Sequence, residues 1–362
     1  MNPKFLNISI IGLGLMGGSI AKALKNNNSS YSISAYDKPE VLELAKSENV
    51  IDIMLNNPEE AISADIIFIC LPLNLSIEIF KKLSHNISSK TIITDVSGVK
   101  LVFQKEWEKI NSSGTYIGGH PMTGKEKGGY ENSDPLLFEN SVYIVTQDIS
   151  QNNELEKFKN VLEILGANIL CIPAKQHDVI AASVSHLPQL LSVALVNTAS
   201  LKTDNYNFLD LAAGGFRDMT RIASSDFNIW ESVIHQNQNQ ILTAIEKLSY
   251  ELGIVKDWVA NNNSVELQKY FNEASKNRNE IPKNTKGFLT PVYDIFVFVK
   301  DEPGVVSKIS TILFDNKINI KDIELLKIRE GDGGTFRLSF DSEETAIEAK
   351  SIISELGYTL KD

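Results

Sequence analysis

Cysteine is scarce in this chain, with two residues in 362, and both stand inside short apolar runs. Cys70 ends the run IIFIC and Cys171 lies in NILCIP, so we expect each in a buried strand. Two cysteines in that setting argue against a disulfide-built secreted scaffold and against a cysteine-rich metal site. A reducing cytoplasm is the expected location, and no metal is expected.

Two further absences concern positive charge and long apolar runs. No long basic stretch occurs, and the formal net charge is −11. The sequence therefore lacks the cationic surface that binds a phosphate backbone. No segment keeps about 18 apolar residues in a row, and the amino terminus shows no separate cationic and apolar leader. We expect a soluble protein with neither a nucleic-acid nor a membrane partner.

A nucleotide-binding signature is present near the amino terminus. FLNISIIGLGLMGGSIAKALKNN contains a β-branched apolar strand, a glycine-rich turn and then helix-forming residues. Gly12, Gly14 and Gly17 have the spacing of a dinucleotide fingerprint, in which glycine permits the tight turn and a close approach to pyrophosphate. Backbone N–H groups at the helix start, around Leu15 and Met16, are then expected to hold the phosphates.

A second strand, YSISAYD, strengthens this interpretation. It ends in Asp37, twenty positions after Gly17, where a carboxylate would accept hydrogen bonds from an adenosine ribose. Asp37 would repel a 2′-phosphate and only Lys38 follows as a cation, so NAD is favoured over NADP as the cofactor. The alternative is that Asp37 is an ordinary turn residue at the end of a strand.

Further apolar strands follow, with helices between them: ADIIFICLP, TIITDV, TYIGGHP, SVYIVT and ANILCIP. The texture of IIFIC is typical of a strand covered on both faces. The pattern predicts an α/β fold that begins with a Rossmann-like, doubly wound sheet. Ligands bind beyond the carboxyl ends of such strands, where the loop with Leu71 and Pro72 and the segments TDVSGVK and GGHPM should converge.

The texture changes twice after this sheet. Helical periodicity without a convincing strand indicates an all-helical middle domain, and a βαββαβ pattern near the carboxyl end indicates a ferredoxin-like unit. A polar segment with a proline separates the two. We expect a dinucleotide-binding domain over residues 1–173, a helical substrate and dimerisation domain over 174–279, a linker over 280–289 and a small domain over 290–362.

His120 is the best candidate for proton transfer. It sits at a strand end between Gly119 and Pro121, whereas His85 and His235 lie in polar surroundings with no partner pattern. An imidazole with an ordinary pKa of about 6.5 can take a proton from an alcohol as hydride leaves, which is the step a dehydrogenase needs. The alternative is a histidine that only caps a loop.

At this point the chain resembles the prephenate dehydrogenases and their arogenate-using relatives, essentially end to end. The resemblance rests on GLGLMGGSIA, TDVSGVK, GGHPMTGKEKGG, HDVIAASVSHLPQ and GGFRDMTRIASSDFNIW. It implies NAD-dependent oxidative decarboxylation of prephenate to 4-hydroxyphenylpyruvate, a step of tyrosine biosynthesis, with His120 as the catalytic base. The alternatives are an arogenate dehydrogenase, a dehydrogenase of another hydroxy acid, or a cofactor-binding amino-acid sensor with a dead redox site.

The resemblance also implies a set of substrate-binding residues. Arg221 matches the substrate-binding arginine, and the further matches are Glu126, Asp218, His186 and Trp230. Alternatives stay open: Arg217 and Arg221 would share a helix face at i and i+4, a solvated cationic face paired with Asp218 or Asp226. Trp230 can equally be core, and His186 a buried, satisfied histidine. Gln189 would be an uncharged reader of the substrate side chain.

One departure from the family pattern concerns the serine that orients the catalytic histidine. The aligned position holds Gly98, and Ser97 precedes it. Ser97 could reach the substrate hydroxyl if the loop shifts by one residue, or a water could replace it. The other interpretation of Ser97 is a turn hydroxyl at a strand end.

The segment DEPGVVSKI resembles the ACT domain fused to some family members. The resemblance implies a regulatory site for an amino acid, with tyrosine as the natural effector, at Gly304 and Asn319. A merely structural domain is the alternative. The apolar helical middle domain would suit a homodimer, the commonest assembly.

Overall fold

The structure is a computed structural model that describes residues 6–27, 31–125, 127–150, 155–199, 207–280, 292–300, 302–329 and 333–361. The chain divides into two compact units, Met1–Lys269 and Tyr270–Asp362. The predicted boundary at residues 173 and 174 falls inside the first unit, and nearly all of the predicted linker 280–289 lies outside the described residues.

The first unit begins with an eight-stranded sheet in the order β3-β2-β1-β4-β5-β6-β7-β8. Chain order reverses between β1 and β4, which is the switch point of the Rossmann arrangement. All pairs are parallel except β6 with β7. The strands are β1 (Leu6–Ile11), β2 (Tyr31–Tyr36), β3 (Ile53–Met54), β4 (Ile66–Ile69), β5 (Ile92–Asp95), β6 (Thr115–Pro121), β7 (Val142–Val145) and β8 (Asn168–Cys171).

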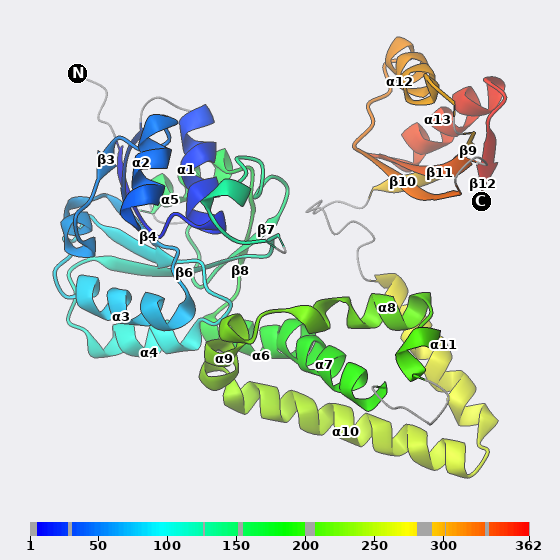
Figure 1. Cartoon of the computed structure of the whole chain (residues 1–362), viewed down its shortest axis with the longest axis horizontal. Helices are drawn as coiled ribbons and strands as arrows, with labels where there is room; N and C mark the ends of the chain where they lie inside the picture. The colour runs from blue at the N-terminus through cyan, green and yellow to red at the C-terminus, as the bar shows by residue number, and fades with distance from the viewer. Residues whose placement is uncertain are drawn as a thin grey trace. The chain divides into compact units, whose positions relative to one another are not determined.

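Helices cover both faces of this sheet (Figure 1), because its central strands are apolar on both sides. One core contains Ile10 and Phe68 with side chains of α1, α2 and α5, and the other contains Ile69 with Phe80 and Phe103 of α3 and α4. This confirms the predicted doubly wound α/β fold. The helices are α1 (Leu15–Asn27), α2 (Pro39–Ser47), α3 (Leu73–Ser84), α4 (Leu101–Lys109) and α5 (Glu156–Ile164).

Two details of the sheet differ from expectation. β3 was not predicted, because it has two residues and both are exposed, so no buried apolar run marks it. The prediction that Cys171 is buried is wrong: β8 is the edge strand of the sheet, and Cys171 is exposed there. An edge strand is covered on fewer sides than a central one, so an apolar run does not guarantee burial at that position.

From Ala174 to Glu280 the described chain contains helices and no strand, as predicted. The helices are α6 (Ala174–Ala181), α7 (Leu187–Ala199), α8 (Gly214–Thr220), α9 (Phe227–Gln236), α10 (Gln238–Ala260) and α11 (Ser264–Glu280), with a π turn over Ala182–His186 and 3₁₀ turns over Phe208–Leu211 and Arg221–Ser224. π turns inside α-helices are frequent at functional sites.

The helical run Ala174–Ala199 buries polar side chains and exposes apolar ones, the reverse of an ordinary surface helix. Among the described residues it is the one helix long and apolar enough to cross a membrane by length and composition, yet only 28% of its most apolar 18-residue window is buried. Its buried side chains include His177, Gln189 and Ser192, whereas Val184 and Leu191 are exposed. The polar face therefore packs into the protein and the apolar face points outward.

The second unit contains a four-stranded antiparallel sheet in the order β10-β11-β9-β12, with α12 and α13 on one face. The chain order β9-α12-β10-β11-α13-β12 is the predicted βαββαβ arrangement. Its elements are β9 (Tyr293–Val299), α12 (Val305–Asp315), β10 (Asp322–Arg329), β11 (Gly333–Phe340), α13 (Glu343–Glu355) and β12 (Thr359–Lys361).

The glycines of the turn after β1 differ in what surrounds them. A Cβ on Gly17 would lie 1.9 Å from the carbonyl oxygen of Gly12, so this position must be glycine for α1 to pack on β1. Gly12 has φ +98°, a left-handed conformation that favours glycine. A Cβ on Gly14 would meet nothing within 4 Å, so Gly14 faces open space.

These positions give a matched pair of substitutions. Gly17→Ala is expected to lower the free energy of unfolding by about 1–3 kcal/mol, since the methyl group overpacks against backbone. Gly14→Ala should leave stability within about 0.5 kcal/mol, yet weaken NADH binding about tenfold or more, because its methyl group enters the space a pyrophosphate would take. Chemical denaturation and NADH fluorescence titration measure both effects. Equal stability of the two variants, or unchanged NADH affinity of Gly14→Ala, would contradict this interpretation.

Candidate active site

The loops predicted to converge lie at the carboxyl ends of neighbouring parallel strands. Gly12 follows β1, Asp37 follows β2, Leu71 and Pro72 follow β4, and His120 lies near the end of β6. The β1 and β4 loops touch, because a Cβ on Gly12 would lie 2.6 Å from the carbonyl oxygen of Cys70 and 2.9 Å from Leu71 Cδ2. The edge therefore combines the glycine-rich turn with the histidine.

Asp37 uses its two carboxylate oxygens on backbone donors. The Leu13 N–H donates to Oδ2 at 2.5 Å, which ties the glycine-rich turn to the end of β2. The Lys38 N–H donates to Oδ1 at 2.7 Å. Because an ionised carboxylate offers about four acceptor sites, both oxygens keep room for a ribose hydroxyl.

The His120 ring is held on one edge and open toward a glycine on the other. Its Nδ1 lies 2.8 Å from His177 Nε2, and the two rings meet edge to face. On the opposite edge, a Cβ on Gly98 would lie 3.9 Å from His120 Cε1 and Nε2. Nε2 is therefore the nitrogen left for a substrate proton.

Burial lowers the pKa of His120 well below its ordinary value, and the nearby His177, Lys100 and His186 lower it further. The imidazole is therefore neutral at physiological pH. A neutral imidazole is the form that can accept a proton, so the lowered pKa suits a general base.

A buried ion pair fixes the strand ends beneath His120. The side chains of Lys100 and Asp95 are fully buried and form a salt bridge, and Lys100 Nζ also donates to the carbonyl oxygen of Gly119 at 2.6 Å. Tyr116 donates to Asp95 Oδ1 at 3.0 Å, and the Ser97 N–H donates to Asp95 Oδ2 at 3.0 Å. One carboxylate thus connects β5, β6 and the loop that leads into α4.

Ser97 does not orient His120 by a hydrogen bond in this structure. Its Oγ is buried and has no hydrogen-bond partner among the described residues. The position that faces His120 is Gly98, which stands where the family pattern has its serine. An unpaired buried hydroxyl beside the candidate base remains available for a polar group of a ligand if the loop adjusts.

The predicted residues of the helical region form a second cluster. The rings of His186 and Trp230 meet edge to face with centroids 6.0 Å apart, and His186 Nδ1 lies 3.2 Å from Asn237 Nδ2. Gln189 donates to the carbonyl oxygen of Ile222 at 2.9 Å, so it holds the 3₁₀ turn that begins at Arg221. Burial lowers the pKa of His186 to about 4.

The basic and acidic residues of the region 217–221 are exposed. Arg217 and Asp218 lie in α8, which ends at Thr220, so Arg221 belongs to the following 3₁₀ turn. The expected i and i+4 face of one continuous helix is thus interrupted between the two arginines. Asp226 caps α9 by accepting from the Asn228 N–H at 2.9 Å. Glu126 lies outside the described residues.

Sequence reasoning did not select the polar residues that lie behind His120. Asp178 accepts from the backbone N–H groups of Lys100 and Leu101, and from the ring of His177. Asn237 donates to the Asp178 carbonyl oxygen at 2.8 Å. The adjacent pair His177 and Asp178 stood inside a quoted family string, but only the fold brings it against His120.

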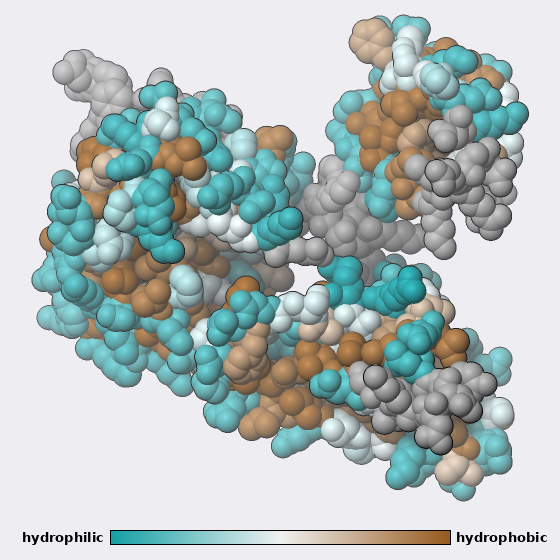
Figure 2. Space-filling model, viewed as in Figure 1, coloured by the Kyte–Doolittle hydropathy of each residue, from teal (hydrophilic) through white to brown (hydrophobic). Residues whose placement is uncertain are grey.

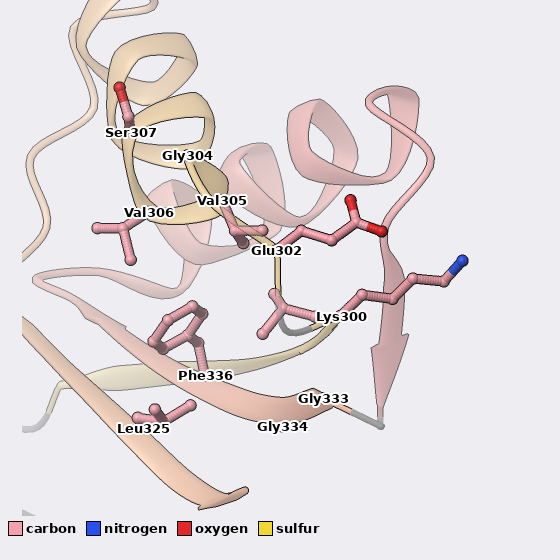
Figure 3. Close-up of a pocket in the computed structure, with 11 residues that line it drawn as sticks. Lys300, Glu302, Gly304, Val305, Val306, Ser307, Leu325, Gly333, Gly334 and Phe336 are labelled. Carbon is pink, nitrogen blue, oxygen red and sulfur yellow. The ribbon is translucent and has the colours of Figure 1, made fainter. Parts of the chain in front are cut away.

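The ACT-like unit holds its own cavity of about 400 Å³ at the start of α12. Figure 3 shows Phe336 and Leu325 on the sheet side, facing Val305 and Val306 of the helix. Gly304 lines the cavity with φ +88°, and a Cβ there would meet nothing within 4 Å. Asn319 is exposed and does not line this cavity.

Known proteins match the chain along nearly its whole length. Residues 20–171 match the nucleotide-binding domain of prephenate dehydrogenase, residues 173–273 match its dimerization domain, and residues 293–356 match the ACT domain. Prephenate dehydrogenase of Bacillus subtilis is 31% identical over an alignment of 362 residues, gaps included, and the alignment covers 98% of this chain and 97% of that one. Prephenate dehydrogenase of Lactococcus lactis is 34% identical over 354 residues, covering 96% and 97%.

Solved structures agree with these matches. Prephenate dehydrogenase of A. aeolicus, solved with hydroxyphenyl propionate and NAD+, superposes with a TM-score of 0.68 at 31% identity, covering 76% of this chain and 98% of that chain. Because the likeness in sequence exceeds 30% identity and extends over nearly the full chain, this protein belongs to the prephenate dehydrogenase family.

Proposed function

We propose that this chain catalyses the NAD-dependent oxidative decarboxylation of prephenate to 4-hydroxyphenylpyruvate, in tyrosine biosynthesis. The observation that carries the proposal is His120, which lies at the carboxyl end of β6 with Nε2 on the side away from its His177 contact. Family membership supports the same reaction. In it the ring carbon that bears the hydroxyl loses hydride, the hydroxyl loses its proton, and the ring carboxylate leaves as CO2.

The residues present fit the dinucleotide. NAD+, when bound, supplies the hydride acceptor. Gly14 faces open space beside the first turn of α1, so backbone can approach a pyrophosphate there, and Leu15 and Met16 offer N–H groups at the helix start. Asp37 would accept from the ribose hydroxyls, and Leu71 and Pro72 would border the site across the switch point.

The protein's own chemical task is proton transfer and substrate orientation. His120 would accept the hydroxyl proton at Nε2, and the unpaired hydroxyl of Ser97 would contact the substrate hydroxyl. Prephenate carries two carboxylates, for which Arg221 would supply a charge-assisted hydrogen bond worth about 1.5–3 kcal/mol. Trp230, His186 and Gln189 would border the substrate, with Asp218 and Glu126 near the entrance.

The outward apolar face of the helical region supports a homodimer. Val179, Ile180, Val184 and Val193 on the run Ala174–Ala199 are exposed, and Leu242 and Leu252 on α10 add to them. Figure 2 shows apolar side chains gathered over this region. An apolar face is unfavourable in water, and packing against a second copy would bury it. The match to a dimerization domain agrees with this arrangement.

The cavity at Gly304 supports amino-acid feedback. Phe336, Leu325 and Val306 provide apolar walls, and Lys300 and Glu302 bring opposite charges near the rim. An amino acid with an aromatic side chain combines these two requirements, and tyrosine is the end product of the proposed pathway. Asn319 lies outside the cavity, so it would not contact an amino acid bound there.

A cytoplasmic location accompanies this proposal. Cys171 is an exposed free thiol, which a reducing compartment keeps intact. Recovery of the activity in the soluble cytosolic fraction of the source cells would agree, and recovery with the membrane or secreted fraction would contradict it.

The direct test is NADH formation by the purified chain with prephenate or arogenate, NAD+ or NADP+, and with or without tyrosine. We expect turnover of prephenate with NAD+, inhibition by tyrosine, and a fall in kcat of about 10²–10⁴ for His120→Asn with NADH binding retained. Turnover of arogenate instead would reassign the substrate. No turnover of either substrate, despite NADH binding, would favour a sensor with an inactive redox site.

The dimer has a matched test of its own. Val184 in the apolar face is 63% exposed, and Leu136 in the nucleotide-binding domain is 65% exposed. Light scattering should give a dimer for the wild type and for Leu136→Glu, and a shift toward monomer for Val184→Glu, because a charge there would be buried at the interface. A monomeric wild type, or an unchanged dimer for Val184→Glu, would contradict the proposed interface.

A further inference from the structure

Two buried side chains, His177 and Asp178, form a hydrogen-bonded chain that leads away from His120, the candidate base. His120 Nδ1 lies 2.8 Å from His177 Nε2, and His177 Nδ1 lies 2.8 Å from Asp178 Oδ1. His177 and Asp178 are each 1% exposed. Since water cannot easily replace either partner at that burial, the hydrogen bonds inside the chain decide where the ring protons sit.

Asp178 is a fixed acceptor at the far end of this chain. Its Oδ1 accepts from the Lys100 N–H at 2.7 Å and its Oδ2 accepts from the Leu101 N–H at 2.9 Å. These donors belong to the start of α4, where a carboxylate is favoured. An ionised carboxylate that already accepts two backbone N–H bonds can only accept, so His177 must carry its proton on Nδ1.

The direction of the next bond follows from this one. In neutral His177 a proton on Nδ1 leaves Nε2 as an acceptor, so His120 must donate from Nδ1. Neutral His120 then carries its lone pair on Nε2, the edge that faces Gly98. The chain from Asp178 thus selects one tautomer of His120, and it is the tautomer in which Nε2 is the base.

We infer that His177 and Asp178 are positioning residues for the proton transfer at His120: they fix its tautomer and ring orientation, and the carboxylate stabilises the imidazolium that forms. This inference rests on the proposed function. When the substrate O–H bond breaks, its proton moves to His120 Nε2, and the electron pair left on oxygen forms the carbonyl as hydride leaves. The proton is held on His120 and is not passed on, so Asp178 remains ionised; when loss of CO2 returns the electron pair to the oxygen, that oxygen takes a proton back and His120 is neutral again.

Other titratable and polar groups surround His120, His177 and Asp178. Lys100, paired with Asp95, lies behind β6, and Tyr116 donates to Asp95. His186 lies on the helical side with Asn237, which donates to the Asp178 carbonyl oxygen. Lys100 opposes an added positive charge on His120, whereas Asp178 is the anion joined to His120 through the hydrogen-bonded ring of His177.

His177→Phe and His177→Gln separate positioning from packing. His177 is the better position to vary, because Asp178 also caps α4. Phenylalanine keeps the ring shape without the hydrogen bonds, and glutamine keeps an acceptor for His120 Nδ1. We expect His177→Phe to lower kcat about 10²-fold or more, as loss of an orienting partner does in triads. His177→Gln should recover part of that loss, and exposed His235→Gln should match the wild type.

A double-mutant cycle then distinguishes an action through His120 from a general structural effect. In a His120→Asn background, His177→Phe should change the residual rate less than about twofold, because the residue through which it acts is gone. The same fold-loss in both backgrounds would overturn the inference. So would an unchanged kcat in the wild-type background.

Nitrogen-15 NMR of histidine-labelled protein at pH 8 reads the tautomers without turnover. The chain has 5 histidines, so single substitutions suffice for assignment. We expect His120 with a protonated Nδ1 and a bare Nε2, and a shift toward a protonated Nε2 in His177→Phe. A protonated Nε2 in the wild type would overturn the inference. Because this readout needs no substrate, it remains decisive even if prephenate is not turned over, an outcome that would refute the proposed function alone.

Discussion

The carboxylate of Asp178 is the constraint on which the candidate site depends. It accepts hydrogen bonds from the first N–H groups of α4 in the nucleotide-binding domain and from His177 in α6. The same residue's carbonyl oxygen accepts from Asn237, between α9 and α10. One residue therefore joins the sheet domain to the helical region and, through His177, orients His120. The site is built at the junction of the two domains, where neither could supply it alone.

The helix that carries this constraint serves two surfaces at once. Its inner side presents His177, His186 and Gln189, which would be costly to bury without partners, and each makes a hydrogen bond in the structure. Its outer side presents Val184 and Leu191. A polar inner face and an apolar outer face are explained together if the helix lines a site on one side and packs against a second copy on the other. The same inversion explains why the run has the composition of a membrane span.

Much of the fold and the strand-end position of His120 could be predicted from sequence, because the signals are local. The apolar strands, the glycine spacing and the strand-end setting of His120 each occupy a few consecutive residues. The π turn before Leu187, the partnership of His177 with His120 and the ion pair of Lys100 with Asp95 depend on contacts between distant segments. Local pattern also failed at Cys171, where edge position rather than composition sets exposure. Gly98, which stands where the family pattern has its serine, faces His120 in the structure.

The pH dependence of kcat/KM for prephenate tests the central claim, that neutral His120 accepts the proton. Burial and the neighbouring His177, Lys100 and His186 lower the pKa of His120 well below its ordinary value of 6.5. Since protonation removes the lone pair, activity should persist as pH falls past 6.5 and be lost only at the lowered pKa of the folded protein. This acid-side fall in kcat/KM, the acidic limb of the profile, should be absent from the residual activity of His120→Asn. A wild-type limb at or above pH 6.5, or one that survives in His120→Asn, would contradict the account.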